Sequence, residues 1–193
     1  MNELKLNIQK DNILFFDMDG TLVDTDYANL LSYKKAIQSL IKAENKINIE
    51  FNPNERFNRA SLKIAIPNLT ETEFEKIIKQ KEENYKEYLS ETKLNKPLVD
   101  ILLKHHKTNK TVLVTNCRED RALITLSYHN LTDKFSNIFF RKVSENKKRI
   151  NKYKNAISSL SLSAQTVIVF ENETLEIEDA ILAGIFAKNI IKI

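Results

Sequence analysis

The chain has 193 residues, of which 42% are hydrophobic and 29% charged, and its formal net charge is +4. This composition is typical of a globular protein with one core and room for a small inserted domain, and it excludes a disordered chain. No apolar run reaches the roughly 18 residues that a membrane span needs, and the first residues lack the apolar stretch of a signal peptide. We therefore expect a cytoplasmic protein with neither a membrane nor a nucleic-acid partner, since the charge is only mildly basic. A single cysteine excludes an internal disulfide framework.

Short apolar runs bounded by polar residues recur along the chain. They are residues 13–16, 111–114, 138–140, 167–170 and 189–193. Continuous runs of this length are typical of strands that are covered on both faces in a parallel sheet. Helical periodicity lies between the later runs, with Pro97 well placed in a first helical turn. The alternation predicts an α/β fold with a Rossmann-like, doubly wound parallel sheet.

Residues 26–95 interrupt the alternation and show no convincing strand. Apolar residues at helical spacing predict helices near residues 27–41, 57–64 and 74–89, and Pro67 ends the second of these. Thr70 and Glu73 predict a capping box at the start of the third. We therefore expect a core of residues 1–25 and 96–193 with a small helical domain, residues 26–95, inserted after the first strand.

Polar side chains directly follow three of the predicted strands. Asp17-Met18-Asp19-Gly20-Thr21 follows the first, Thr115 the second and Glu171 the fourth. Ligands of open α/β sheets bind at these carboxyl ends, so these side chains are expected to converge. A carboxylate can attack a phosphate ester only if a cation lowers the repulsion between the two anions, and Mg²⁺ or a lysine supplies that charge. Attack gives an aspartyl-phosphate, and a second carboxyl group exchanges protons with the leaving group and with water.

Three segments resemble motifs of the haloacid-dehalogenase-like (HAD) superfamily. Residues 17–24 resemble its first motif, residues 112–116 its second, and residues 169–172 with 183–185 its fourth. The insert stands where phosphoglycolate phosphatases and beta-phosphoglucomutases carry a helical cap. The resemblance implies that Asp17 is the nucleophile and Asp19 the general acid–base.

The resemblance also implies the remaining ligands. Thr115 and Asn116 would bind the phosphoryl group. Mg²⁺ would lie between Asp17, the backbone carbonyl group of Asp19, and the turn formed by Glu171 and Asn172. The family usually has Asp where this chain has Asn172, which predicts weak metal binding without substrate because an amide offers only a neutral oxygen.

The third motif of the family is a lysine, and two lysines are candidates for binding phosphate. The apolar stripe that begins at Ile150 predicts a helix starting near Lys147, which favours Lys147 and leaves Lys152 as the second choice. In the insert, Arg56, Arg59 and Lys63 are expected to share a helix face. That face is either solvated or grips an anionic substrate, with Arg59 as the candidate contact.

These expectations combine into a magnesium-dependent phosphatase that acts on a small phosphorylated metabolite. One alternative is a sugar-phosphate mutase of the same superfamily, which would use the same residues. The other is a non-catalytic binding protein on the same fold, an alternative that only Asn172 supports. The sequence predicts neither the substrate nor the oligomeric state.

Overall fold

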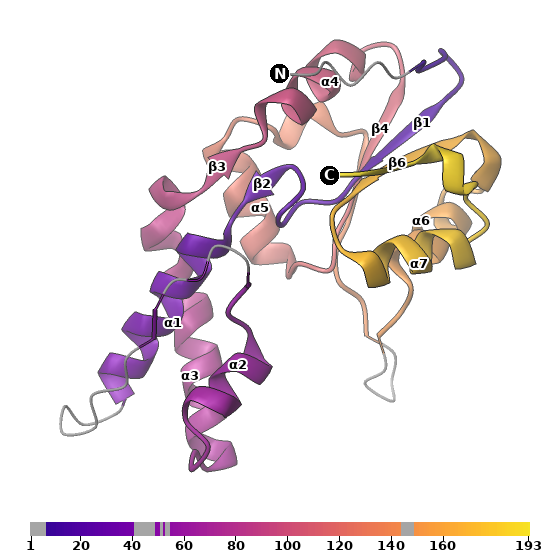
Figure 1. Cartoon of the computed structure of the whole chain (residues 1–193). Helices are drawn as coiled ribbons and strands as arrows, with labels where there is room; N and C mark the ends of the chain where they lie inside the picture. The colour runs from indigo at the N-terminus through magenta and orange to yellow at the C-terminus, as the bar shows by residue number, and fades with distance from the viewer. Residues whose placement is uncertain (1–6, 41–48, 51, 53–54, 144–148) are drawn as a thin grey trace. The chain divides into compact units, whose positions relative to one another are not determined.

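The computed structural model describes residues 7–40, 49–50, 52, 55–143 and 149–193. The chain divides into two compact units, which we call the sheet unit (residues 1–23 and 94–193) and the helical unit (residues 24–93). It leaves the sheet unit at β2 (Val23–Asp24) and returns at β3 (Lys93–Leu94), and these two short strands pair with each other (Figure 1).

The sheet unit is built on a five-stranded parallel sheet with the order β5-β4-β1-β6-β7. The strands are β1 (Ile13–Phe16), β4 (Lys110–Val114), β5 (Asn137–Phe139), β6 (Val167–Glu171) and β7 (Ile190–Lys192). At the carboxyl end of β1, Phe16 is in register with Leu113 of β4 and with Phe170 of β6. The residues that follow β1, β4 and β6 therefore emerge side by side at one edge of the sheet, with those of β1 in the middle.

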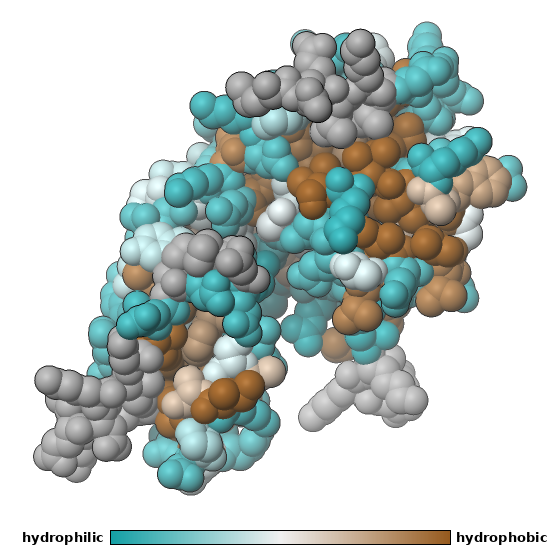
Figure 2. All heavy atoms as spheres, in the orientation of Figure 1, coloured by the Kyte–Doolittle hydropathy of each residue, from teal (hydrophilic) through white to brown (hydrophobic). Residues whose placement is uncertain are grey.

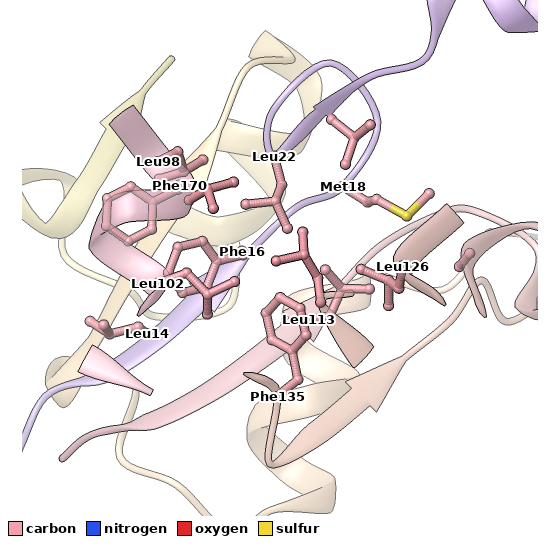
Figure 3. Packing of buried hydrophobic residues seen from close by; sticks show 14 of the residues in the cluster. Leu14, Phe16, Met18, Leu22, Leu98, Leu102, Leu113, Leu126, Phe135 and Phe170 are labelled. Carbon is pink, nitrogen blue, oxygen red and sulfur yellow. The ribbon is translucent and has the colours of Figure 1, made fainter. Parts of the chain in front are cut away.

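Helices cover both faces of this sheet. They are α4 (Lys96–His105), α5 (Glu119–Tyr128), α6 (Lys152–Ser159) and α7 (Thr174–Leu182), with short 3₁₀ turns at η2 (Thr132–Lys134), η3 (Ala164–Thr166) and η4 (Ala187–Asn189). On one face Phe16 packs in a cluster with Leu98 of α4 and Leu126 of α5 (Figure 3). On the other face Phe15 packs with Tyr153 of α6 and with Ala180 of α7. Successive residues of β1 thus serve opposite faces, and the predicted doubly wound α/β fold is confirmed.

The start of α6 differs from the sequence prediction. A helix beginning near Lys147 was expected, but α6 begins at Lys152, with Asn151 as its N-cap accepting a hydrogen bond from the Lys154 backbone N–H at 2.9 Å. The expectation was wrong because Ile150 continues the apolar spacing of the helix without being helical. Lys147 itself lies outside the described residues.

The helical unit contains α1 (Asp26–Leu40), α2 (Arg59–Ala65), α3 (Glu71–Asn84) and the 3₁₀ helix η1 (Tyr85–Glu91). Its core is one cluster in which Leu30 and Tyr33 of α1 pack with Ile77 of α3. The predicted capping box is present: the Thr70 hydroxyl accepts from the Glu73 backbone N–H, and the Glu73 carboxylate accepts from the Thr70 backbone N–H at 2.9 Å. It supplies partners for two polar backbone groups at the start of α3.

The second helix of this unit begins later than the sequence predicted. It begins after an N-cap at Asn58, so Arg56 precedes the helix and does not share a helix face with Arg59. The prediction failed because Asn58 forms its own capping box with Ser61, so the helix begins only after Asn58. Arg56 instead lies 3.5 Å from the Asp26 carboxylate.

The surface of the sheet unit carries several large hydrophobic side chains. They gather on the side formed by β6, β7 and α7 (Figure 2), where Leu175, Leu182 and Phe186 are exposed. None of the helices among the described residues is both long and apolar enough to cross a membrane.

Candidate active site

The loop after β1 carries two carboxylates and turns sharply. The Asp17 backbone N–H donates to the Phe170 carbonyl group at 3.1 Å, which extends the pairing of β1 with β6 by one residue. The chain then folds back, and the backbone N–H groups of Leu22 and Val23 both donate to the Met18 carbonyl group at 3.0 Å. This turn brings the side chains of Asp17 and Asp19 to the carboxyl edge of the sheet, where both are nearly buried.

Gly20 is required in this turn for two reasons. Its φ is +78°, a left-handed conformation that side chains disfavour. A Cβ at this position would also lie 2.5 Å from the Asn172 side-chain nitrogen. Asn172 therefore packs directly on the loop after β1, and its Oδ1 accepts a hydrogen bond from the Thr21 hydroxyl at 2.9 Å.

Lys152 lies at the centre of the site. Its Nζ donates to Asp17 Oδ1 at 2.7 Å and to Glu171 Oε2 at 2.8 Å, and it lies 3.5 Å from Glu176 Oε2. The side chain is only 3% exposed, so this ammonium group and its carboxylate partners form a buried ion cluster. The sheet brings together Asp17 and Glu171 from neighbouring strands, and the first residue of α6 places a cation between them.

Glu171 is fully buried, and both of its oxygens have two donors. Oε1 accepts from the backbone N–H groups of Asn172 and Glu173 at 2.9 and 3.0 Å. Oε2 accepts from Lys152 and from the Tyr153 hydroxyl, which lies at 2.6 Å. A carboxylate offers about four lone-pair positions, so these four donors account for all of them. In this arrangement Glu171 holds Lys152 in place.

The charges of the cluster depend on burial and on one another. Burial raises the pKa of Asp17 to about 7, against the opposing effect of the Lys152 ammonium group. Burial by itself would lower the pKa of Lys152, but the Asp17 and Glu171 carboxylates outweigh it and raise that pKa above its usual value. Burial and the same two carboxylates also raise the pKa of Tyr153, which therefore remains a hydroxyl donor. Lys152 is thus a permanent positive charge that favours the ionised form of Asp17.

Thr115 and Asn116 follow β4 at the same edge of the sheet. Thr115 is 1% exposed, and its hydroxyl accepts from the Cys117 backbone N–H at 3.1 Å. The Asn116 side-chain nitrogen donates to Glu176 Oε1 at 2.9 Å, an oxygen that the Arg149 guanidinium group also contacts. Asn116 Oδ1 is buried and has no hydrogen-bond partner among the described residues.

Sequence reasoning did not find two residues of the site, Tyr153 and Arg121. Arg121, in the first turn of α5, donates from Nη2 to Asp19 Oδ2 at 2.7 Å. A sequence signal existed, because a cation in the first turn opposes the helix dipole and needs an anionic partner. Nothing in the spacing, however, identified that partner as Asp19, which is 102 residues away.

Two predicted site residues are not placed in this cluster. Lys147 lies outside the described residues. Arg59 is exposed at the first position of α2 in the helical unit, and a contact between Arg59 and substrate stays a prediction.

Among the residues that the structure describes, no group of three or more His, Cys, Asp or Glu side chains is placed to hold a metal ion.

Comparisons with known proteins identify the family of this chain. The family model of haloacid dehalogenase-like hydrolases matches residues 14–189. A search of the curated proteins found no match.

Many solved structures have a similar fold. One is described as a predicted phosphoglycolate phosphatase, from Haemophilus somnus, at 20% identity and a TM-score of 0.72, over 96% of this chain and 86% of that one. A Thermotoga maritima protein named as a beta-phosphoglucomutase has 24% identity and a TM-score of 0.66, over 94% and 84%. The Bacillus subtilis HAD-hydrolase YfnB, bound to magnesium, has 20% identity and a TM-score of 0.59, over 90% and 86%. Because the family model spans nearly the whole chain, this protein belongs to the haloacid dehalogenase-like hydrolases.

Proposed function

We propose that the protein is a phosphomonoester hydrolase that works through an aspartyl-phosphate on Asp17. The observation that supports this most directly is the Lys152 ammonium group between Asp17 and Glu171, 2.7 and 2.8 Å from their carboxylates. A buried carboxylate with a fixed cation beside it suits attack on an electrophile that is itself an anion. The phosphatase and mutase names of structural neighbours point to the same class of substrate.

In the first step an Asp17 oxygen attacks phosphorus, and the bond from phosphorus to the leaving oxygen breaks. Asp19 gives its proton to that oxygen, so the alcohol leaves neutral. Lys152 lowers the repulsion between Asp17 and the phosphoryl oxygens, and the Thr115 hydroxyl group donates to one of them. Glu171, which also accepts a hydrogen bond from the Tyr153 hydroxyl, keeps Lys152 in place by accepting from its ammonium group.

In the second step Asp19 acts as a base. It removes a proton from a water molecule, and the resulting nucleophile attacks the phosphorus of the aspartyl-phosphate. The bond between phosphorus and the Asp17 oxygen breaks, which releases inorganic phosphate and restores the Asp17 carboxylate. Asp19 ends the cycle protonated, ready for the next leaving group.

The residues at this edge of the sheet suit a Mg²⁺ site in which a phosphate oxygen of the substrate would be a further ligand. Glu171, whose lone pairs all have protein donors, would contribute negative charge beside the site and no ligand atom. The donors would be the Asp17 carboxylate, the Asp19 backbone carbonyl group and the Asn172 amide oxygen. All are hard oxygen donors, as Mg²⁺ prefers, and one carboxylate plus a substrate phosphate is a common way of binding it. Bound Mg²⁺ would supply positive charge that stabilises the phosphoryl oxygens.

The test is a panel of phosphate esters assayed with Mg²⁺ for release of inorganic phosphate. We expect turnover of at least one ester, trapping of radioactive phosphate on the protein, and loss of both in Asp17→Asn. Asp11→Asn is the matched control, because Asp11 is exposed ahead of β1. An Asp17→Asn variant with activity within tenfold of the wild type would rule out the covalent mechanism. Return of the phosphoryl group to a sugar, without release of phosphate, would make the protein a mutase.

A further inference from the structure

Arg121 occupies a position where a cation is unfavourable unless an anion faces it. It is the third residue of α5, in the turn where the helix dipole favours acids, and two acids, Glu119 and Asp120, precede it. Its guanidinium group meets the Asp19 carboxylate at 2.7 Å, with the two side chains 13% and 11% exposed. A charge-assisted hydrogen bond that is mostly shielded from water is among the stronger polar contacts in proteins.

The same guanidinium group has a second partner on the other side of the site. Its Nε donates to Cys117 Sγ at 2.9 Å, and Cys117 is 2% exposed in the turn after β4. The backbone N–H of Cys117 in turn donates to the Thr115 hydroxyl. Arg121 therefore connects the phosphate-binding turn after β4 with the loop after β1. Because the guanidinium fork is planar and rigid, two fixed contacts determine its orientation.

We propose that Arg121 is a positioning residue for Asp19. By holding Oδ2 it fixes the side-chain conformation from which the carboxyl group gives its proton to the leaving oxygen as the bond from phosphorus breaks. Arg121 transfers no proton and contacts no substrate. Proton transfer requires the two oxygens to be within about 2.6–3.2 Å, and a displacement of about 1 Å can cost on the order of 100-fold in rate. The inference rests on the proposed function, since it assumes that Asp19 is the general acid.

The leaving group provides the test. p-Nitrophenolate leaves without a proton, whereas an alkoxide needs one, so only alkyl phosphates depend on a well-placed acid. The ratio kcat/KM includes no step after departure of the leaving group, which separates this proton transfer from hydrolysis of the aspartyl-phosphate. In Arg121→Met we expect kcat/KM for the best alkyl phosphate of the panel to fall about 10- to 100-fold, and that for p-nitrophenyl phosphate to stay within about threefold. Arg121→Lys keeps the charge but has one donor group, so its loss of kcat/KM on the alkyl phosphate should be intermediate. If Arg121→Met does not fold, Arg121→Lys provides the same comparison of the two substrates.

Two further variants complete the experiment. Arg118→Met removes a neighbouring cation that pairs with Asp120 at the surface, and it should leave the ratio of the two kcat/KM values unchanged. Asp19→Asn removes the acid itself, so it shows the largest difference between the losses of kcat/KM on the two substrates that a misplaced acid can cause. Suppose that Arg121→Met lowers kcat/KM equally on both substrates, whereas Asp19→Asn lowers it more on the alkyl phosphate. The positioning role of Arg121 would then be overturned, and the acid role of Asp19 would stand. If Asp19→Asn does not discriminate, the acid role of Asp19 is refuted, and the proposal for Arg121 with it.

Discussion

Replacing Lys152 with methionine tests the central ion cluster. Methionine keeps much of the length and the apolar stem of lysine but removes the ammonium group. The carboxylates of Asp17 and Glu171 then lose a partner at 2.7 and 2.8 Å, and Glu176 loses one at 3.5 Å. Arg149 remains beside Glu176 but contacts neither of the other two in the described structure.

The size of the effect follows from burial. Asp17, Glu171 and Glu176 are 5%, 0% and 5% exposed, so water cannot replace the lost partner. Removing one member of a buried ion pair typically costs about 3–5 kcal/mol, because the remaining charge is left without compensation. With a denaturant slope of about 2 kcal/mol per molar urea, the unfolding midpoint should fall by roughly 1.5–2.5 M.

The assay is urea unfolding followed by far-UV circular dichroism at pH 8 and at pH 5. The Lys152 ammonium group opposes the effect of burial on Asp17, so without it the pKa of Asp17 rises further, and only in the folded state. The folded state then binds more protons than the unfolded state, so the loss of stability is larger at pH 8 and shrinks as the pH falls. Lys154→Met is the control: this lysine lies on the same helix but is exposed, and its replacement should change stability by less than about 0.5 kcal/mol.

A Lys152→Met protein within about 1 kcal/mol of the wild type at pH 8 would refute the buried ion cluster. A catalytic comparison accompanies it. We expect Lys152→Ala to reduce turnover more than Lys147→Ala, because Lys152 contacts the nucleophile. The opposite order would return the phosphate-binding role to Lys147.

Two other perturbations have defined outcomes. Asn172→Asp should lower the Mg²⁺ concentration that gives half-maximal activity, since it adds a charged oxygen donor, and Glu171→Gln should raise it; a titration curve unmoved by Asn172→Asp would show that this side chain does not face the metal. Thr70→Ala should cost about 1 kcal/mol in urea unfolding by removing the capping box of α3, while Thr72→Ala, within the helix, should be neutral or slightly stabilising. Equal effects of the two threonine changes would contradict the capping argument.

Local patterns predicted most of the elements correctly. The five apolar runs became the five strands, because a strand covered on both faces has no polar positions to disguise it. The Thr70–Glu73 capping box formed as predicted, since its hydrogen bonds join residues three positions apart. The errors were also local. The helices α2 and α6 begin later than the apolar spacing suggested, because Asn58 and Asn151 cap them. A cap is a polar residue outside the apolar pattern, so periodicity does not detect it.

By itself the sequence predicted the fold class and the family, and it predicted that Asp17, Thr115 and Glu171 would lie together at the strand ends. It could do so because these residues directly follow buried strands, whose carboxyl ends meet at one edge of a parallel sheet. The tertiary structure alone showed that Lys152 contacts Asp17 across 135 residues, and that Arg121 contacts Asp19 across 102. Such pairings depend on where a helix begins and which face it turns to the sheet. A shift of one helical residue rotates a side chain by about 100°, and no pattern along the chain records that rotation.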